Sequence, residues 1–177
     1  MAGFSTFQNM KYTITTILFL IASSALARGT YQEPKDFLNN IFKNNPPAIK
    51  KMWITGKTRE VVTEILQHKP SRLRVNYWQK GSRSVWILDE IGKEQPVTAG
   101  IVINNGKIER VKVLIFRESR GDEIRHPFFV KQFSQAALNK QLQLDHSIDG
   151  ISGATLSVRA LTKLSRLALY LSQQIKP

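Results

Sequence analysis

Two segments in the first half of the chain carry apolar residues at helical spacing. The first predicts a helix that begins near Pro34, and the second predicts a helix over residues 57–68, with Thr58 as a possible N-cap. Residues 48–54 lie between them and fit either a short strand or a helical turn. The apolar face of each helix repeats at i, i+1, i+4 and i+5: Phe37, Leu38, Ile41 and Phe42, then Val61, Val62, Ile65 and Leu66.

From residue 72 the apolar period changes to two, which is typical of strands. The first such segment, residues 72–77, alternates Leu73, Val75 and Tyr77 with polar residues. Three further strands are predicted over residues 84–89, 97–103 and 107–116. Asn105-Gly106, between the last two strands, is a strong hairpin signal. Strands joined by short turns pair antiparallel, so these four segments predict an antiparallel sheet.

The last third of the chain is predicted to be mostly helical. A helix is expected over residues 127–138, a short strand over 141–144, a loop over 145–152 and a long C-terminal helix over 154–174. Together the patterns predict the α+β class, with an antiparallel sheet of about four to six strands and packed helices. On the C-terminal helix a basic face lies beside the apolar one, and it consists of Arg159, Lys163 and Arg166.

The N-terminal segment has the pattern of an export signal. Lys11 precedes an apolar run, and small residues follow, ending in Ala25-Leu26-Ala27. This order predicts a secretory signal peptide over residues 1–27, a single domain over residues 28–177 and a periplasmic location. The alternative is an uncleaved segment that anchors the domain to the outer face of the inner membrane.

The net charge and the absence of cysteine limit which partners and redox groups the chain can have. The formal net charge is +13, and it becomes +12 without residues 1–27, which hold one Lys and no acidic residue. Such a charge suits an acidic redox partner or an anionic membrane surface, although a merely solvated basic surface explains it equally well. Export argues against nucleic acid. The chain has no Cys, which excludes disulfides, thiolate-bound clusters and covalent c-type haem. The three His residues lack ligand spacing, so no metal site is predicted.

The loop that enters the C-terminal helix is the best candidate for chemistry. Its sequence is Asp149-Gly150-Ile151-Ser152-Gly153-Ala154-Thr155-Leu156-Ser157. Two glycines allow close approach of a ligand, and the free amides of a first helical turn bind anions. An ordinary helix start capped by Ser152 explains the same residues. A P-loop is excluded, because Gly-Lys-Ser/Thr is missing.

This segment resembles the flavinylation motif of the FMN-binding domain family, roughly Asp-x-x-Ser/Thr-Gly-Ala-Thr-x-Ser/Thr. Known members include the C subunit of the sodium-pumping NADH:quinone oxidoreductase and the G subunit of the Rnf complex. The resemblance covers about residues 84–172 and is weaker before them. It implies that Thr155 carries FMN through a phosphoester, installed from FAD by a flavin transferase. Asp149, Gly150, Ser152, Gly153, Ala154 and Ser157 would complete the recognition sequence.

The resemblance also implies contacts to the flavin ring. Family members carry a Glu-Thr/Ser-x-Gly loop near the ring, and Glu118, Ser119 and Gly121 match it, although Arg120-Gly121-Asp122-Glu123 departs from the Pro-Gly-Leu-Gly of the complex subunits. Trp86 is a further candidate contact, as are Phe128 and Phe129.

The implied function is extracytoplasmic electron transfer between a membrane oxidoreductase and another redox partner, with no catalytic residue in the chain itself. The alternatives are a flavin-dependent reductase of a small substrate and a non-redox module that binds anions.

Overall fold

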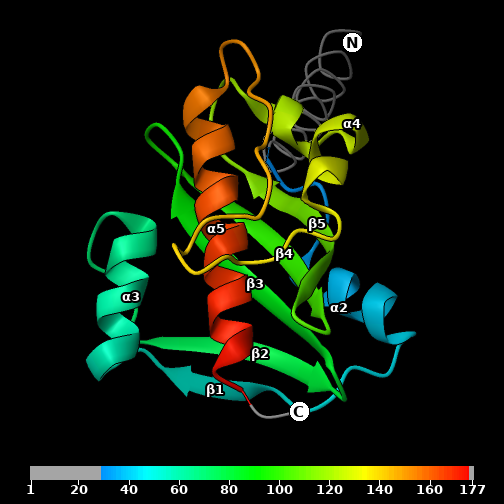
Figure 1. Cartoon of the computed structure of the whole chain (residues 1–177). Helices are drawn as coiled ribbons and strands as arrows, with labels where there is room; N and C mark the ends of the chain where they lie inside the picture. Colours follow the sequence, from blue (N-terminus) through cyan, green and yellow to red (C-terminus); the bar gives the residue numbers. More distant parts are fainter. Residues whose placement is uncertain (1–28, 176–177) are drawn as a thin grey trace, which may run out of the picture. The chain divides into compact units, whose positions relative to one another are not determined.

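Five antiparallel strands form the central sheet of the computed structural model, which describes residues 29–175 (Figure 1). The strands pair in chain order, so the sheet is a meander. The predicted α+β class and antiparallel sheet are confirmed, and residues 48–54 contribute an edge strand. The strands are β1 (Lys50–Trp53), β2 (Arg74–Lys80), β3 (Arg83–Ile91), β4 (Pro96–Asn104) and β5 (Lys107–Phe116).

The hairpin between β4 and β5 forms where the sequence predicts it. Asn105 and Gly106 both have positive φ, 49° and 74°. Positive φ at both central residues defines the turn whose twist matches that of the flanking strands. This turn aligns β4 with β5, which leads directly into the loop at residues 117–121.

Helices cover both faces of the sheet. α5 (Thr155–Gln173) crosses one face and packs on β3 and β4, beside α3 (Gly56–Leu66), as Figure 1 shows. α2 (Pro34–Phe42) packs on the other face through Phe37, Leu38, Ile41 and Phe42. Successive strand residues point to opposite faces. Val85 therefore meets α2, whereas the neighbouring Trp86 belongs to the core beneath α5.

Gly100 on β4 makes room for the helix on the α2 face. A Cβ added there would lie within 2.8 Å of three ring atoms of Phe37, which is 1% exposed. We expect Gly100→Ala to destabilise the fold by roughly 1–3 kcal/mol, because α2 must shift to admit the methyl group. Urea unfolding measures this, with Gly150→Ala as control, since its Cβ meets nothing within 4 Å. If Gly100→Ala lowers the unfolding free energy as much in a Phe37→Leu background as in the wild type, contact with Phe37 is not the cause.

The helix predicted over residues 127–138 is wrong in extent. Within that range the chain forms two short pieces instead, α4 (Pro127–Val130) and η2 (Lys131–Phe133), and a further short helix, η1 (Asp122–Arg125), precedes them. The backbone then turns with Gln135 at φ 65° and pairs with the edge of β5. Gln135 N–H donates to Ile108 O at 2.8 Å, and Ile108 N–H donates to Ala136 O at 2.9 Å. These hydrogen bonds pair the backbone of Ile108 at the edge of β5, which a continuous helix would leave unpaired.

Two N-terminal predictions have different outcomes. Thr58 is not a cap, because α3 begins at Gly56 and Thr55 holds the N-cap position. The export signal predicted over residues 1–27 lies outside the described residues, so it stays a prediction. Within residues 29–175, no helix has the length and apolar content needed to cross a bilayer.

Candidate functional site

Thr155 is the first residue of α5, and the helix start is uncapped. Ala154 holds the N-cap position and makes no side-chain cap hydrogen bond, so the alternative that Ser152 caps the helix is wrong. Within residues 29–175, no group accepts from the N–H groups of Thr155, Leu156 and Ser157. Unsatisfied amides at a helix start, together with the helix dipole, favour an anion. The first turn of α5 therefore has free donors beside the Thr155 hydroxyl.

The nine-residue motif divides into an exposed part and a buried part. Thr155 is exposed, and Gly153 before it adopts φ 79°, a conformation that favours glycine. Ala154 and Ser157 are 3% and 4% exposed and belong to the packed interior. The remaining polar and glycine positions are open to solvent, and they are Asp149, Gly150 and Ser152.

The Glu118–Gly121 loop lies against the start of α5. Gly121 has φ 90°, and a Cβ there would lie 2.6 Å from the Ser157 Oγ and 3.4 Å from the Ala154 Cβ. The two segments are therefore in direct contact although 33 or more residues separate them in the sequence. Ala154 and Ser157 are small because the backbone of Gly121 packs on them.

Glu118 closes the turn between β3 and β4. Its Oε1 accepts from the backbone N–H groups of Lys93, Glu94 and Gln95 at 2.6, 2.6 and 2.9 Å. Burial alone would raise the pKa of Glu118, but the three N–H donors outweigh it and hold that pKa below its ordinary value. The carboxylate therefore remains ionised and fixes the position of Lys93.

These segments enclose a pocket of about 480 Å³, which we call the Thr155 pocket. Its charged groups are two cations, Lys93 and Arg120, and the carboxylate of Glu118. Six predicted site residues thus share one pocket: Glu118, Ser119, Gly153, Ala154, Thr155 and Ser157. The full lining is Lys93, Glu118, Ser119, Arg120, Gly153, Ala154, Thr155, Leu156 and Ser157.

Two residues that the sequence did not single out hold the loop before the motif. Gln132 Oε1 accepts from Asp149 N–H at 2.7 Å, and His146 Nε2 donates to Gln132 O at 2.8 Å. Asp145 binds the other ring nitrogen of His146 at 2.8 Å. The Gln132 carbonyl has the largest effect and raises the pKa of His146 above its ordinary value; burial opposes this shift, and Asp145 adds to it. No local sequence pattern identifies these two residues, because Gln132 of η2 reaches this loop only in the folded chain.

The aromatic residues predicted to contact the ring do not line the Thr155 pocket. Trp86 is fully buried, stacks on Tyr77 with ring centroids 4.9 Å apart and donates from Nε1 to Ser84 Oγ. Phe129 is also fully buried, in the core. Phe128 is 65% exposed and stacks on His126.

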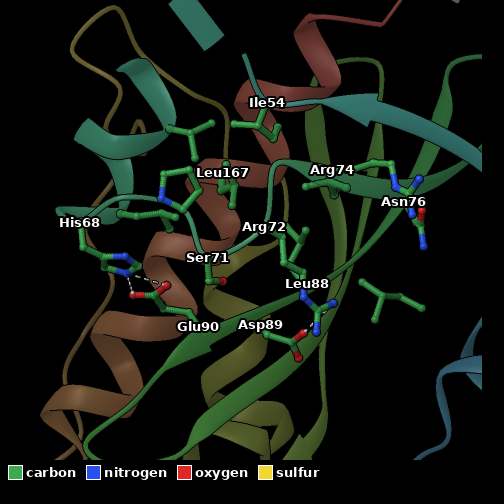
Figure 2. Close-up of a pocket in the computed structure, with 15 residues that line it drawn as sticks. Ile54, His68, Ser71, Arg72, Arg74, Asn76, Leu88, Asp89, Glu90 and Leu167 are labelled. Carbon is green, nitrogen blue, oxygen red and sulfur yellow. Dashed lines mark hydrogen bonds and ion pairs between the residues drawn. The ribbon is translucent and has the colours of Figure 1, made fainter. Parts of the chain in front are cut away.

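A second, smaller hollow of about 120 Å³ lies between α3, β2 and β3 (Figure 2). Figure 2 shows His68 pointing toward Glu90 at its rim, and the two are 2.9 Å apart. Glu90 is 5% exposed and also accepts from Lys163 Nζ at 3.4 Å. The Lys69 carbonyl and then Glu90 raise the pKa of His68 above its ordinary value, although burial and Lys163 oppose this shift.

We expect the His68–Glu90 contact to stabilise the fold more at low pH. Both ring nitrogens face acceptors, Lys69 O and the Glu90 carboxylate, which only the protonated ring can satisfy with two N–H donors. Because folding raises the pKa of His68, this stabilisation is fully present below the unfolded pKa and is lost as pH rises through the folded one. The difference in unfolding free energy between wild type and His68→Gln should shrink from pH 5.5 to 8.5. An increase over that range would contradict the assignment.

Comparison with known proteins connects the site to a family. The profile described as the FMN-binding domain matches residues 92–170, a range that contains β4, β5, the Thr155 pocket and most of α5. Searches of curated proteins and of solved structures found no significant match. The family binds FMN, and the matched range ends within the helix that Thr155 begins. Residues 92–170 therefore form a domain of the FMN-binding family, and the chain is a flavin-binding protein.

Proposed function

We propose that the chain carries FMN as a phosphoester on Thr155 and transfers electrons outside the cytoplasm. The observation that carries this proposal is the position of Thr155. Its side chain is exposed at the uncapped start of α5, inside the matched family range. Isoalloxazine chemistry would supply the redox step. The protein's own residues would bind and orient the group.

The Thr155 pocket suits the phosphate end of such a group. The free N–H groups of Leu156 and Ser157 are donors, and Lys93 and Arg120 add positive charge. The helix dipole contributes only about 0.3–1 kcal/mol toward an anion. An effect of this size would orient a phosphate but would not retain the cofactor. A covalent bond would supply that retention.

Attachment requires a separate flavin transferase. A Thr hydroxyl is a poor nucleophile, and within the described chain no side chain is hydrogen-bonded to that of Thr155 as a base. The transferase would remove the hydroxyl proton, form the bond from Thr155 Oγ to the FMN phosphorus of FAD and release AMP. It would contact the exposed positions of the motif, such as Asp149 and Ser152. Ala154 and Ser157 are buried and would instead shape the helix start.

The proposed role is that of a carrier, not of an enzyme with its own substrate. The export signal predicted over residues 1–27 supports a periplasmic location, and a covalently held cofactor is not lost there. The chain has no Cys and so no thiol-based redox group of its own. A membrane oxidoreductase would supply electrons, and a second extracytoplasmic protein would accept them. The basic surface also suits contact with anionic lipid.

The proposal is tested by labelling. Residues 28–177 are co-expressed with a flavin transferase, denatured and examined by mass spectrometry. We expect the mass of one FMN phosphoester and a labelled peptide that maps to Thr155. If the transferase labels a control protein while this chain remains unmodified, the covalent linkage is excluded.

A further inference from the structure

A hollow opens where two neighbouring strands of the sheet separate. β2 and β3 pair with each other only over Tyr77–Lys80 and Arg83–Trp86. In the part of the chain that the structure describes, β3 beyond Trp86 pairs only with β4, and the first residues of β2 pair only with β1. The hollow of about 120 Å³ in Figure 2 lies in this fork, and we call it the β2–β3 hollow.

The floor of the β2–β3 hollow is apolar. Ile54, Leu88 and Leu167 line it, and they are 1%, 6% and 5% exposed members of the core beneath α5. A cavity of about 150 Å³ lined by residues of this kind holds a benzene molecule. At about 120 Å³, the β2–β3 hollow therefore has room for one branched or aromatic side chain, whose burial there is favourable.

The rim of the hollow carries two arginines. Arg74 points to the α2 face, because the adjacent Val75 packs on the core beneath α5. Its Cζ lies 5.7 Å from the centroid of the Trp53 ring, and no oxygen of the described chain accepts a hydrogen bond from it. Trp53 is the cross-strand partner of Arg74 and is 62% exposed. Figure 2 shows Arg72 pointing toward Asp89, but their N and O atoms are 3.8 Å apart, too far for a hydrogen bond.

The acidic residues of the rim, in contrast, already have close partners. Asp89 accepts from Thr98 Oγ1 at 2.6 Å, and Glu90 is 2.9 Å from His68 Nε2. A cation that approached the hollow would therefore find both carboxylates engaged, whereas a carboxylate would find the donors of Arg74 free. The formal net charge of +13 would attract a negatively charged partner in the same way.

We propose that the β2–β3 hollow docks an acidic protein, which inserts one apolar side chain between the strands and places a neighbouring carboxylate on Arg74. Trp and Arg beside a pocket for an anchor side chain are typical of the residues that contribute most to protein–protein binding. A lipid surface would leave the hollow unfilled, because a bilayer presents no single protruding side chain.

The position of the hollow separates this contact from the Thr155 pocket. Leu167 lines the hollow and follows Thr155 by twelve residues of α5, which corresponds to roughly 18 Å along the helix axis. The acidic protein would therefore hold the chain while the start of α5 stays accessible. The inference does not depend on flavin attachment.

The test uses short acidic peptides as probes of the hollow. The first, Glu-Asp-Phe-Asp-Glu, carries both features, the second has Ser in place of Phe, and the third has Gln and Asn in place of the acids. Binding to the isotope-labelled chain is followed by NMR titration of its backbone amides. We expect the first peptide to shift amides around the hollow, such as those of Val75 and Leu88. It should bind about tenfold more tightly than the other two, and salt should weaken it.

Two variants separate the charged rim from the apolar floor. Arg74→Glu reverses a charge on the rim, and Ser71→Phe places a ring at the opening, since Ser71 is exposed and lines the hollow. Each should weaken the first peptide about tenfold. Both residues are exposed, so urea unfolding should show a retained fold. Lys107→Glu is the matched control, because it makes a charge reversal on an exposed residue at the other end of the sheet, and affinity should not change.

The same titrations can overturn the proposal. Equal affinity for the Phe and Ser peptides would mean that charge alone attracts them. Unchanged affinity in folded Arg74→Glu and Ser71→Phe would place the contact elsewhere, and failure of every peptide to bind at millimolar concentration would exclude the docking site. Vesicles of anionic phospholipid are the last comparison. If they bind in a manner that Arg74→Glu abolishes while no peptide binds, this surface contacts a membrane and not a protein.

Discussion

Thr155→Val is expected to abolish covalent flavin completely. Val keeps the branched shape of Thr but lacks the hydroxyl that would form the phosphoester. Because Thr155 is exposed and makes no hydrogen bond through its side chain, the unfolding free energy should change by less than about 0.5 kcal/mol. Flavin retention after denaturation and intact mass measure the label, and urea unfolding measures stability.

Thr155→Ser is the matched control. It restores a hydroxyl at the same position, so we expect at least partial labelling. Ser152→Ala removes a neighbouring hydroxyl that does not cap the helix, and the label should then remain on Thr155. If Thr155→Val retained flavin through denaturation, the attachment would be at another residue, and the assignment of the site would be wrong.

Gly121→Ala is expected to have the second largest effect, through the packing of two distant segments. The backbone there has φ 90°, and the added Cβ would lie 2.6 Å from Ser157 Oγ. The left-handed conformation costs roughly 1–2 kcal/mol for a residue with a Cβ, and the buried clash brings the total to roughly 2–4 kcal/mol. The first turn of α5 must shift, so transferase labelling should slow several-fold.

Gly106→Ala separates the two causes. Gly106 has φ 74°, but a Cβ there meets nothing within 4 Å. This variant should therefore lose only the free energy of the strained backbone conformation, and it should be labelled at the wild-type rate. Urea unfolding and the initial rate of labelling report both quantities. Equal losses of stability in the two variants would mean that contact with Ser157 contributes nothing.

Features set by neighbouring residues were predictable from the sequence. The face of α2, the Asn105-Gly106 hairpin and the start of the long C-terminal helix near Thr155 all appear as expected. Each depends on periodicity or on turn chemistry within a few residues. The same local reasoning extended a helix to residue 138, because it could not include the pairing of Ile108 with the following segment.

The sequence by itself determined the family motif, the α+β class and Thr155 as the candidate attachment residue, because these are carried by short patterns. Only the tertiary structure decided which residues share a pocket with Thr155. It placed Trp86 in the core and bound Glu118 to the turn at residues 93–95. It also buried Arg166 of α5 and bound its Nε to Leu142 O. The physical reason is that burial and hydrogen-bond satisfaction depend on segments far apart in the chain, and no local pattern records which of them will meet.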